Sequence, residues 1–288
     1  MTISASSWTG LVCAFVAAVC YAGLNTAIRF ADAHMSVWHI IFYRSLFGVF
    51  VVVLLAGMTG VWIFGRQRLT LCLLGLSGAL GVTALTVALI LLPLFEALVL
   101  LYLFPAFAAL LSPWLTSDHV SQRDWIFIGT ACFGTALVLW SGQLGSGIQW
   151  GHFLGLFASF CLGLTFTLIR RISADNSPLT PFFYICVAGI VVSIGPVLLQ
   201  PTIFAISSDG LPALVTVAVL ATVAHLAGNK ALVYLPSPRV GVILMSEVIF
   251  GAIIGLLIFG EFLGLRTLLG GVLIIGGGIG LNFNRQQS

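Results

Sequence analysis

A proline interrupts one of the most apolar stretches of the chain, LLYLFPAFAALL at residues 100–111, and two aromatic side chains precede it. A proline inside a helix removes a backbone hydrogen bond and costs a water-exposed helix about 3 kcal/mol. Beside such a bend, two rings and one tyrosine hydroxyl would suit an apolar or aromatic solute. We therefore predict that Tyr102, Phe104 and Pro105 border a substrate cavity; the alternative is that both rings only pack against lipid or a neighbouring helix.

A carboxylate stands in a second apolar stretch, where Ser246 and Glu247 open the segment SEVIFGAIIGLLIFGE. A charged carboxylate in the middle of a membrane costs several kcal/mol unless it is protonated, paired or exposed to water. We place Ser246 and Glu247 in the substrate site, where Glu247 would bind a substrate ammonium group or carry a proton. The alternative is a structural ion pair, for which Arg44, inside another apolar stretch, is the candidate partner.

Further polar and aromatic residues recur at helical spacing in other apolar stretches. His225 and Asn229 are four residues apart and share a helix face, where the histidine could sense pH or bind a carboxylate when charged. A hydrogen bond to a neighbouring helix is the alternative role for His225. Tyr21 and Asn25 share a face in the same way, and Phe166 stands at the matching position of a later stretch. We add these five residues to the predicted substrate site.

Helices that cross a membrane must position these residues. Only 7% of the 288 residues are charged, 60% are hydrophobic, and the mean hydropathy of +1.18 is far above that of a soluble domain. A bilayer core of about 30 Å needs about 20 apolar residues per helix. The sequence predicts an all-α membrane protein with ten transmembrane helices, at residues 8–30, 36–57, 70–92, 95–116, 124–142, 150–171, 179–199, 211–234, 239–259 and 264–283. The first is a full-length span, so we interpret it as a retained helix and not as a signal peptide.

The basic residues indicate how these helices are oriented. If the N-terminus is cytoplasmic, only Arg29 and Arg266 fall outside, and the cytoplasmic side receives Arg66, Arg68, Arg123, Arg170, Arg171, Lys230, Arg239 and Arg285. This asymmetry follows the positive-inside rule. We therefore predict a multi-pass protein of the cell inner membrane with both termini in the cytoplasm. The net charge of +3 is spread over loops, so no nucleic-acid partner is expected.

The chain is also predicted to contain a duplicated unit. A shift of 141 residues aligns AAVCYAGLNTAIRF, at residues 17–30, with ASFCLGLTFTLIRR, and a shift of 143 aligns later positions: Leu92 and Pro93 with Leu235 and Pro236, Asp118 with Glu261, Arg123 with Arg266, and Gly134 with Gly277. We place the two units at residues 1–145 and 146–288. Each holds five spans, an odd number, so the two units enter the membrane in opposite orientations. Inverted repeats of this kind are typical of carriers with a central substrate site.

The repeated segments resemble a known family. LFPAFAALLSPWLTSD and SEVIFGAIIGLLIFGE, each followed by a glycine-rich last helix, are similar to the two copies of the EamA-type domain of the drug/metabolite transporter superfamily. The resemblance covers almost the whole chain, although Asp118 replaces the usual glutamate and Val248 the usual proline. It implies a ten-helix exporter whose third, fourth, eighth and ninth helices line the cavity. The tyrosine, phenylalanine and proline at residues 102–105 are similar to those of bacterial aromatic amino acid exporters.

The function predicted from these observations is a secondary transporter that exports small organic solutes, with apolar or aromatic amino acids as the first substrate class, by alternating access. Drugs or other metabolites are the main alternative substrates, and a nucleotide sugar or phosphate ester is a weaker one, because few cationic residues could reach the cavity. An intramembrane enzyme is the alternative outside transport, but HExxH, paired aspartates and Gly-x-Ser-x-Gly are absent. We therefore predict that the protein is not an enzyme.

No cofactor or metal is predicted, because the six cysteines include no CxxC pair and are interpreted as core residues. The expected partners are a small-molecule substrate, the lipid bilayer and a second copy of the chain in a homodimer. The glycines of the last span would allow close helix contact, either within the fold or between two copies. They are Gly270, Gly271, Gly276, Gly277, Gly278 and Gly280.

Overall fold

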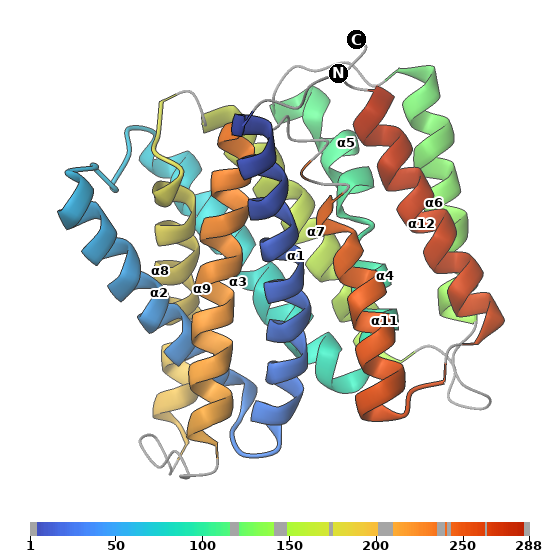
Figure 1. Cartoon of the computed structure of the whole chain (residues 1–288), viewed down its shortest axis with the longest axis horizontal. Helices are drawn as coiled ribbons and strands as arrows, with labels where there is room; N and C mark the ends of the chain where they lie inside the picture. Colours follow the sequence, from blue (N-terminus) through green and yellow to red (C-terminus); the bar gives the residue numbers. More distant parts are fainter. Residues whose placement is uncertain are drawn as a thin grey trace.

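The structure is a computed structural model that describes residues 5–115, 121–140, 149–172, 175–200, 210–234, 240, 243–262 and 264–284. Every regular element in these ranges is a helix, and successive helices run up and down the molecule (Figure 1). The helices are α1 (Ala5–Asp32), α2 (Val37–Thr59), α3 (Arg68–Leu91), α4 (Leu94–Leu101), α5 (Phe104–Leu115), α6 (Gln122–Trp140), α7 (Trp150–Ile172), α8 (Leu179–Leu198), α9 (Leu211–Tyr234), α11 (Ser246–Phe259) and α12 (Leu265–Asn284). The prediction of an all-α fold is confirmed.

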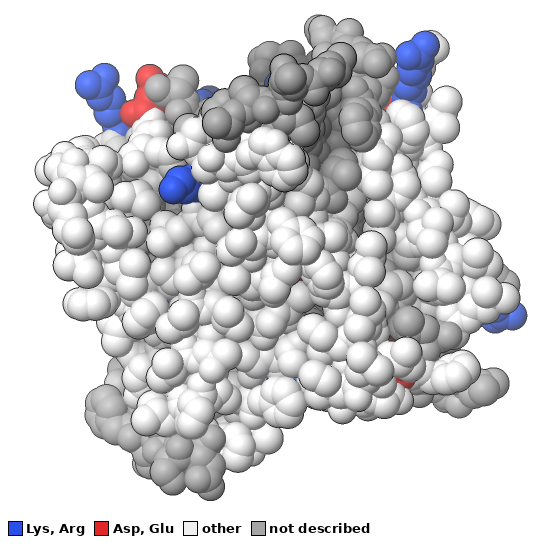
Figure 2. All heavy atoms as spheres, viewed as in Figure 1, with Lys and Arg blue, Asp and Glu red and all other residues white. Residues whose placement is uncertain are grey.

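Most of these helices are long and apolar enough to cross a membrane. Within the described ranges, seven segments meet this description by length and composition, with α4 and α5 counted as one, and α11 and part of α12 are shorter apolar helices. Large apolar side chains such as Phe50 and Leu257 are mostly exposed on the outside. On the face shown in Figure 2, Lys and Arg lie near the ends of the molecule, and uncharged side chains cover the middle. The chain is therefore a multi-pass membrane protein.

The start of α1 and the end of α12 lie at the same end of the molecule (Figure 1). Five spans per half produce this arrangement. An odd number of crossings takes the first half to the opposite end, and the second half, entering from there, returns the chain to the first end. Which end faces the cytoplasm stays a prediction from the basic residues, of which Arg239 and Arg285 lie outside the described residues.

Two predicted spans are broken at equivalent positions. The fourth is divided into α4 and α5, with Tyr102 and Leu103 between them. The ninth, predicted as one helix over residues 239–259, turns at Met245 before α11 begins at Ser246, so its continuity was wrongly predicted. The shift of 143 residues places Met245 on Tyr102, and therefore both halves break their fourth helix at the same point.

Twin contacts between α6 and α12 show the two-fold relation directly. A Cβ added to Gly134 would lie 2.6 Å from the Gly270 oxygen, and one added to Gly277 would lie 2.7 Å from the Phe127 oxygen. The shift of 143 converts the first pair into the second. These two helices run side by side at the right of Figure 1 and cross on the pseudo-two-fold axis.

A second pair of twin contacts lies between α2 and α8. A Cβ on Gly48 would meet the Cys186 sulfur, and a Cβ on Gly189 would meet the Ser45 hydroxyl. The shift of 141 converts one pair into the other. Helices α1 and α7 likewise pack against α9 and α3, which are also exchanged by the shift. The inverted five-helix repeat is thus confirmed, although the predicted boundary at residues 145 and 146, and the matched residues Asp118, Leu235 and Pro236, lie outside the described residues.

Most glycines of α12 are required for packing inside the fold. Gly270, Gly277 and Gly280 face α6, and Gly271 faces Phe95 of α4, whereas a Cβ on Gly276 would have nothing within 4 Å. Close contact within one chain therefore accounts for these residues. A homodimer stays a prediction.

We expect Gly277→Ala to lower the free energy of unfolding by about 1–3 kcal/mol, because its Cβ would collide with the backbone of α6. Gly276→Ala is the matched control, since its Cβ enters open space and alanine favours helix. Thermal unfolding of both variants in detergent would measure the difference. Equal unfolding temperatures would contradict the close crossing of α6 and α12.

Candidate functional site

A buried carboxyl group lies where the two broken spans meet. Glu247, in the first turn of α11, is 4% exposed. Its Oε1 accepts a 2.6 Å hydrogen bond from Asn25 Nδ2 of α1, and its Oε2 lies 2.6 Å from the Tyr102 hydroxyl oxygen. Both partners are buried as well. The group therefore joins α1 to the breaks of the fourth and ninth spans.

The alternative that Glu247 pairs with Arg44 is wrong. Arg44 belongs to α2, which packs against α8 and α9, whereas α11 packs against α1 and α4. The electrostatic neighbours of Arg44 are Tyr21, Cys186 and His225. Neither partner of the Glu247 carboxyl group is a basic residue.

Tyr102 also completes the backbone at the break of the ninth span. In a continuous helix, the Leu244 carbonyl would accept the amide of Val248, but that amide donates to Met245 at 3.1 Å. The Tyr102 hydroxyl lies 2.6 Å from the Leu244 oxygen and satisfies it. Ser246 Oγ donates to the Ile243 carbonyl in the same turn, at 2.6 Å. Side chains therefore stabilise this break, although it contains no proline.

At the break of the fourth span, a serine side chain replaces the backbone hydrogen bond that the proline removes. Pro105 has no amide hydrogen to donate to the Leu101 carbonyl, and Ser159 Oγ of α7 donates to it instead, at 3.1 Å. Ser159 is fully buried. The two breaks then pack against the same residue of α12, because a Cβ on Gly278 would lie 2.5 Å from Met245 Cε and 3.7 Å from Pro105 Cγ.

We expect Ser159→Ala to destabilise the protein by about 1–3 kcal/mol, since it leaves the Leu101 carbonyl buried without a donor. Ser193→Ala is the matched control: Ser193 is equally buried, but its hydroxyl bonds to the Gly189 carbonyl within its own helix, where a backbone amide remains available. Thermal unfolding in detergent would compare the two. Similar losses in both variants would show that the Leu101 carbonyl does not depend on Ser159.

An aromatic cluster lies next to the break in the fourth span. The Phe104 ring stacks on the Phe166 ring of α7, with centroids 4.9 Å apart and an angle of 21° between the planes. Its centroid is 5.9 Å from that of Tyr102. Phe104 is partly buried and Phe166 is 40% exposed. The structure thus brings together three of the aromatic residues that the sequence places in the substrate site.

His225 and Tyr21 form a second group, between α9 and α1. The Tyr21 hydroxyl lies 3.0 Å from His225 Nδ1, and the imidazole stacks on Phe182 of α8 at a centroid distance of 4.7 Å. Asn229 lies apart from this group, because its Nδ2 donates to the Pro178 carbonyl at the start of α8. The helical spacing of His225 and Asn229 therefore does not bring both into one site.

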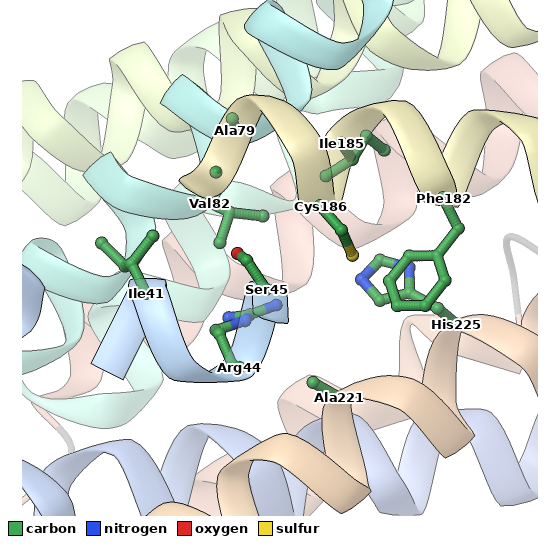
Figure 3. A pocket seen from close by; sticks show the side chains of 11 residues that line it. Ile41, Arg44, Ser45, Ala79, Val82, Phe182, Ile185, Cys186, Ala221 and His225 are labelled. Carbon is green, nitrogen blue, oxygen red and sulfur yellow. The ribbon is translucent and has the colours of Figure 1, made fainter. Parts of the chain in front are cut away.

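A narrow cavity opens beside His225, between α2, α3, α8 and α9 (Figure 3). Arg44 and Ser45 reach it from α2, and Phe182 and Cys186 reach it from α8. Arg44 is 9% exposed, and its guanidinium makes no hydrogen bond or ion pair with a described residue. The remaining lining residues are Ile41, Ala79, Val82, Ile185, Gly189 and Ala221.

An arginine joins several segments at the end of the molecule opposite the start of α1 and the end of α12. Arg29, in the last turn of α1, donates to the Leu89 and Leu92 carbonyls at 2.7 and 2.5 Å and forms an ion pair with Glu261. Glu261 in turn accepts the Leu94 amide at the start of α4, at 2.8 Å. This arginine group, Arg29 with Glu261, therefore holds together α1, the end of α3, the start of α4 and the segment after α11.

Comparison with known proteins agrees with this architecture. The model of the EamA-like transporter family matches residues 8–140 and again residues 149–283. The chain belongs to this family. The transporter is 23% identical over 268 residues to the pseudopaline exporter CntI of two Pseudomonas aeruginosa strains, UCBPP-PA14 and PAO1, with 93% of each chain covered. A solved crystal structure of a protein superposes with a TM-score of 0.65 at 17% identity, covering 97% of this chain and 99% of the other, which shows a shared fold.

The sequence did not predict two features of this transporter. The arginine group is one, since Arg29 and Glu261 stand at span ends and resemble interfacial charges. The cavity wall is the other, although the shift of 141 places Ser45 on Cys186 and could have indicated that they lie together. In the part of the chain that the structure describes, no three His, Cys, Asp or Glu side chains gather to hold a metal ion.

Proposed function

We propose that this transporter exports small organic solutes, with apolar or aromatic amino acids as the first class, by alternating access across the cell inner membrane. Its family and its resemblance to an exporter support transport out of the cell. The inverted repeat supports alternating access, because two arrangements of such halves are close to mirror images of each other. We further propose that both termini lie in the cytoplasm.

The observation that carries this proposal is the meeting of two broken helices. Irregular backbone at membrane depth is tolerated only where protein or a water-filled cavity satisfies its polar groups. Tyr102 satisfies the Leu244 carbonyl here, and Phe104 and Phe166 lie beside the same break. A solute with an aromatic or apolar group could insert between these rings when the halves rearrange.

The arginine group supports alternating access in a second way. It holds together the helices at the end opposite the start of α1 and the end of α12, which is the extracellular end in the proposed orientation. Release of an exported solute would require these contacts to separate. The cavity beside Arg44 supports a nucleotide sugar or phosphate ester less well, because Arg44 is the one lysine or arginine among its described lining residues.

Uptake of labelled tryptophan, phenylalanine and a nucleotide sugar into liposomes that hold the purified protein would test the proposal. We expect transport of the two amino acids, reduced about tenfold by Phe166→Ala through loss of ring stacking. Phe160→Ala is the matched control: Phe160 is on the same helix and 39% exposed, but its ring contacts Phe107 instead. Lack of amino acid transport by well-folded protein would overturn the substrate class, and equal effects of the two variants would overturn the role of the ring cluster.

A further inference from the structure

We propose that the cavity between α2, α3, α8 and α9 binds the carboxylate group of the transported solute, with Arg44 as its principal partner. This inference rests on the proposed function, because it names the part of a transported amino acid that the cavity would bind. It also assigns a role to Arg44, which takes no part in the contacts at the two helix breaks.

The first argument is the isolation of the Arg44 charge. The residue is 9% exposed, and its guanidinium has no hydrogen-bond or ion-pair partner among the described residues. A buried cation costs several kcal/mol unless it is paired or hydrated. By contrast, Arg29 is saturated by two carbonyls and Glu261. An unpaired arginine facing a cavity is therefore a site for an anion that enters from outside.

The second argument is the chemistry of the cavity wall. None of the described lining residues is acidic, and Ser45 adds a hydroxyl donor next to Arg44. In the neutral tautomer with hydrogen on Nε2, His225 accepts the Tyr21 hydroxyl at Nδ1 and keeps a second donor free. Figure 3 shows these three side chains around one space. Hydrogen-bond donors that lack a partner suit a carboxylate ligand, which an arginine can bind through two parallel hydrogen bonds.

The third argument explains why the anion belongs to an apolar solute. Phe182, Ile41 and Ile185 form the rest of the wall, and Phe182 stacks on His225. The cavity has a volume of about 10 Å³, so it admits the carboxylate end of a solute and leaves the aromatic part outside. The carbon atoms next to the carboxylate would contact these apolar surfaces, whereas an inorganic anion would gain nothing from them. The symmetry supports a single charge, because the shift of 141 places Ile185 on Arg44 and only one half supplies a cation.

Ligand pairs that differ in one group would test the site. Thermal stabilisation of the purified protein in detergent would be titrated with phenylacetate, which has a carboxylate but no ammonium group, and with phenethylamine, which has the reverse. We expect Arg44→Gln to weaken phenylacetate binding about tenfold to hundredfold and to leave phenethylamine unchanged. Arg44→Lys should recover part of the loss, because lysine keeps the charge without the bidentate geometry. Arg66→Gln, at an exposed arginine, is the matched control.

Stability separates this role from a structural one. Removal of an unpaired buried charge should leave the unfolding temperature of ligand-free Arg44→Gln unchanged or raised, whereas removal of a structural contact should lower it. Equal phenylacetate binding by the wild type and Arg44→Gln would overturn the proposal, as would equally tight binding of chloride. These binding measurements do not depend on transport. If amino acid uptake failed, an Arg44-dependent carboxylate site would still stand. If uptake occurred and Arg44→Gln did not change it, the proposed function would stand without the carboxylate site.

Discussion

Replacement of Glu247 by glutamine is expected to abolish any response of transport to a pH gradient while preserving the fold and passive movement of solute down its own gradient. The reason lies in the hydrogen bonds around the Tyr102 hydroxyl. This hydroxyl has one hydrogen but lies 2.6 Å from two acceptors, the Leu244 carbonyl and Glu247 Oε2. One of these close contacts lacks a hydrogen if Glu247 is charged.

A proton on Glu247 Oε2 supplies the missing hydrogen. Glu247 then donates to the Tyr102 oxygen, Tyr102 donates to the Leu244 carbonyl, and Asn25 still donates to Oε1. Both carboxyl oxygens of Glu247, the Tyr102 hydroxyl and the Leu244 carbonyl then each have a partner, as buried polar groups require. The described conformation therefore fits a protonated Glu247. A glutamine amide reproduces this pattern, because its NH₂ donates to Tyr102 and its oxygen accepts Asn25.

Loss of the Glu247 proton would change the hydrogen bonds that stabilise the helix break. A charged carboxylate would draw the Tyr102 hydrogen away from the Leu244 carbonyl and leave that end of the broken helix without its donor. The titratable groups that interact with Glu247 are Tyr21 of α1 and Tyr102, while Arg29 at the far end of α1 is paired with Glu261. Among the described residues, no lysine or arginine therefore forms an ion pair with Glu247 that would stabilise its charged form.

Liposome uptake with and without an imposed pH gradient would measure this effect. Glu96→Gln is the matched control, since Glu96 is 6% exposed on α4 but lies near His152 and Thr267, away from the breaks. We expect that variant to keep whatever pH response the wild type has. A full pH response in Glu247→Gln would contradict proton binding at Glu247.

The sequence places the members of this central group in one site because such residues are costly in an apolar chain, and their role in substrate binding stays a prediction. A buried glutamate, a midspan tyrosine and a proline are unusual in an apolar chain, so each indicates a compensating contact. Ser246, Glu247, Tyr102 and Asn25 do lie together. The break at Met245 could not be predicted, because residues 243–248 contain no proline and its stabilisation comes from a tyrosine 142 positions away from Leu244.

Predictions that depend on relative helix rotation were less successful. Helical spacing shows that His225 and Asn229 share a face, but not that this face meets Tyr21 at one end and the Pro178 carbonyl at the other. The pairing of Arg44 with Glu247 failed for the same reason. Which neighbour a helix face meets is decided by packing, such as the glycine crossings of α2 with α8, and one sequence alone does not give the partner of each crossing.

Arg29→Met is expected to lower the free energy of unfolding by about 3–5 kcal/mol, the second large effect that we predict. It removes the partner of Glu261, whose side chain is 11% exposed, and leaves the Leu89 and Leu92 carbonyls without their donor. Thermal unfolding in detergent would measure the loss. Arg266→Met is the control, as an exposed arginine at the same end of the molecule. Equal losses in the two variants would contradict a closing role for Arg29.

A double variant would separate the ion pair from the carbonyl contacts. Adding Glu261→Gln to Arg29→Met removes the uncompensated charge while a glutamine oxygen can still accept the Leu94 amide. Part of the stability should return, and the remaining loss would measure the two carbonyls that only Arg29 reaches. In the proposed orientation, these contacts hold together the end through which an exported solute would leave. If the transporter alternates between two states as proposed, the single variant should also shift the population toward the state open at that end. Spin labels placed on α1 and α11 near this end would then show longer distances than in the wild type. Unchanged distances would mean that helix packing alone keeps the end closed.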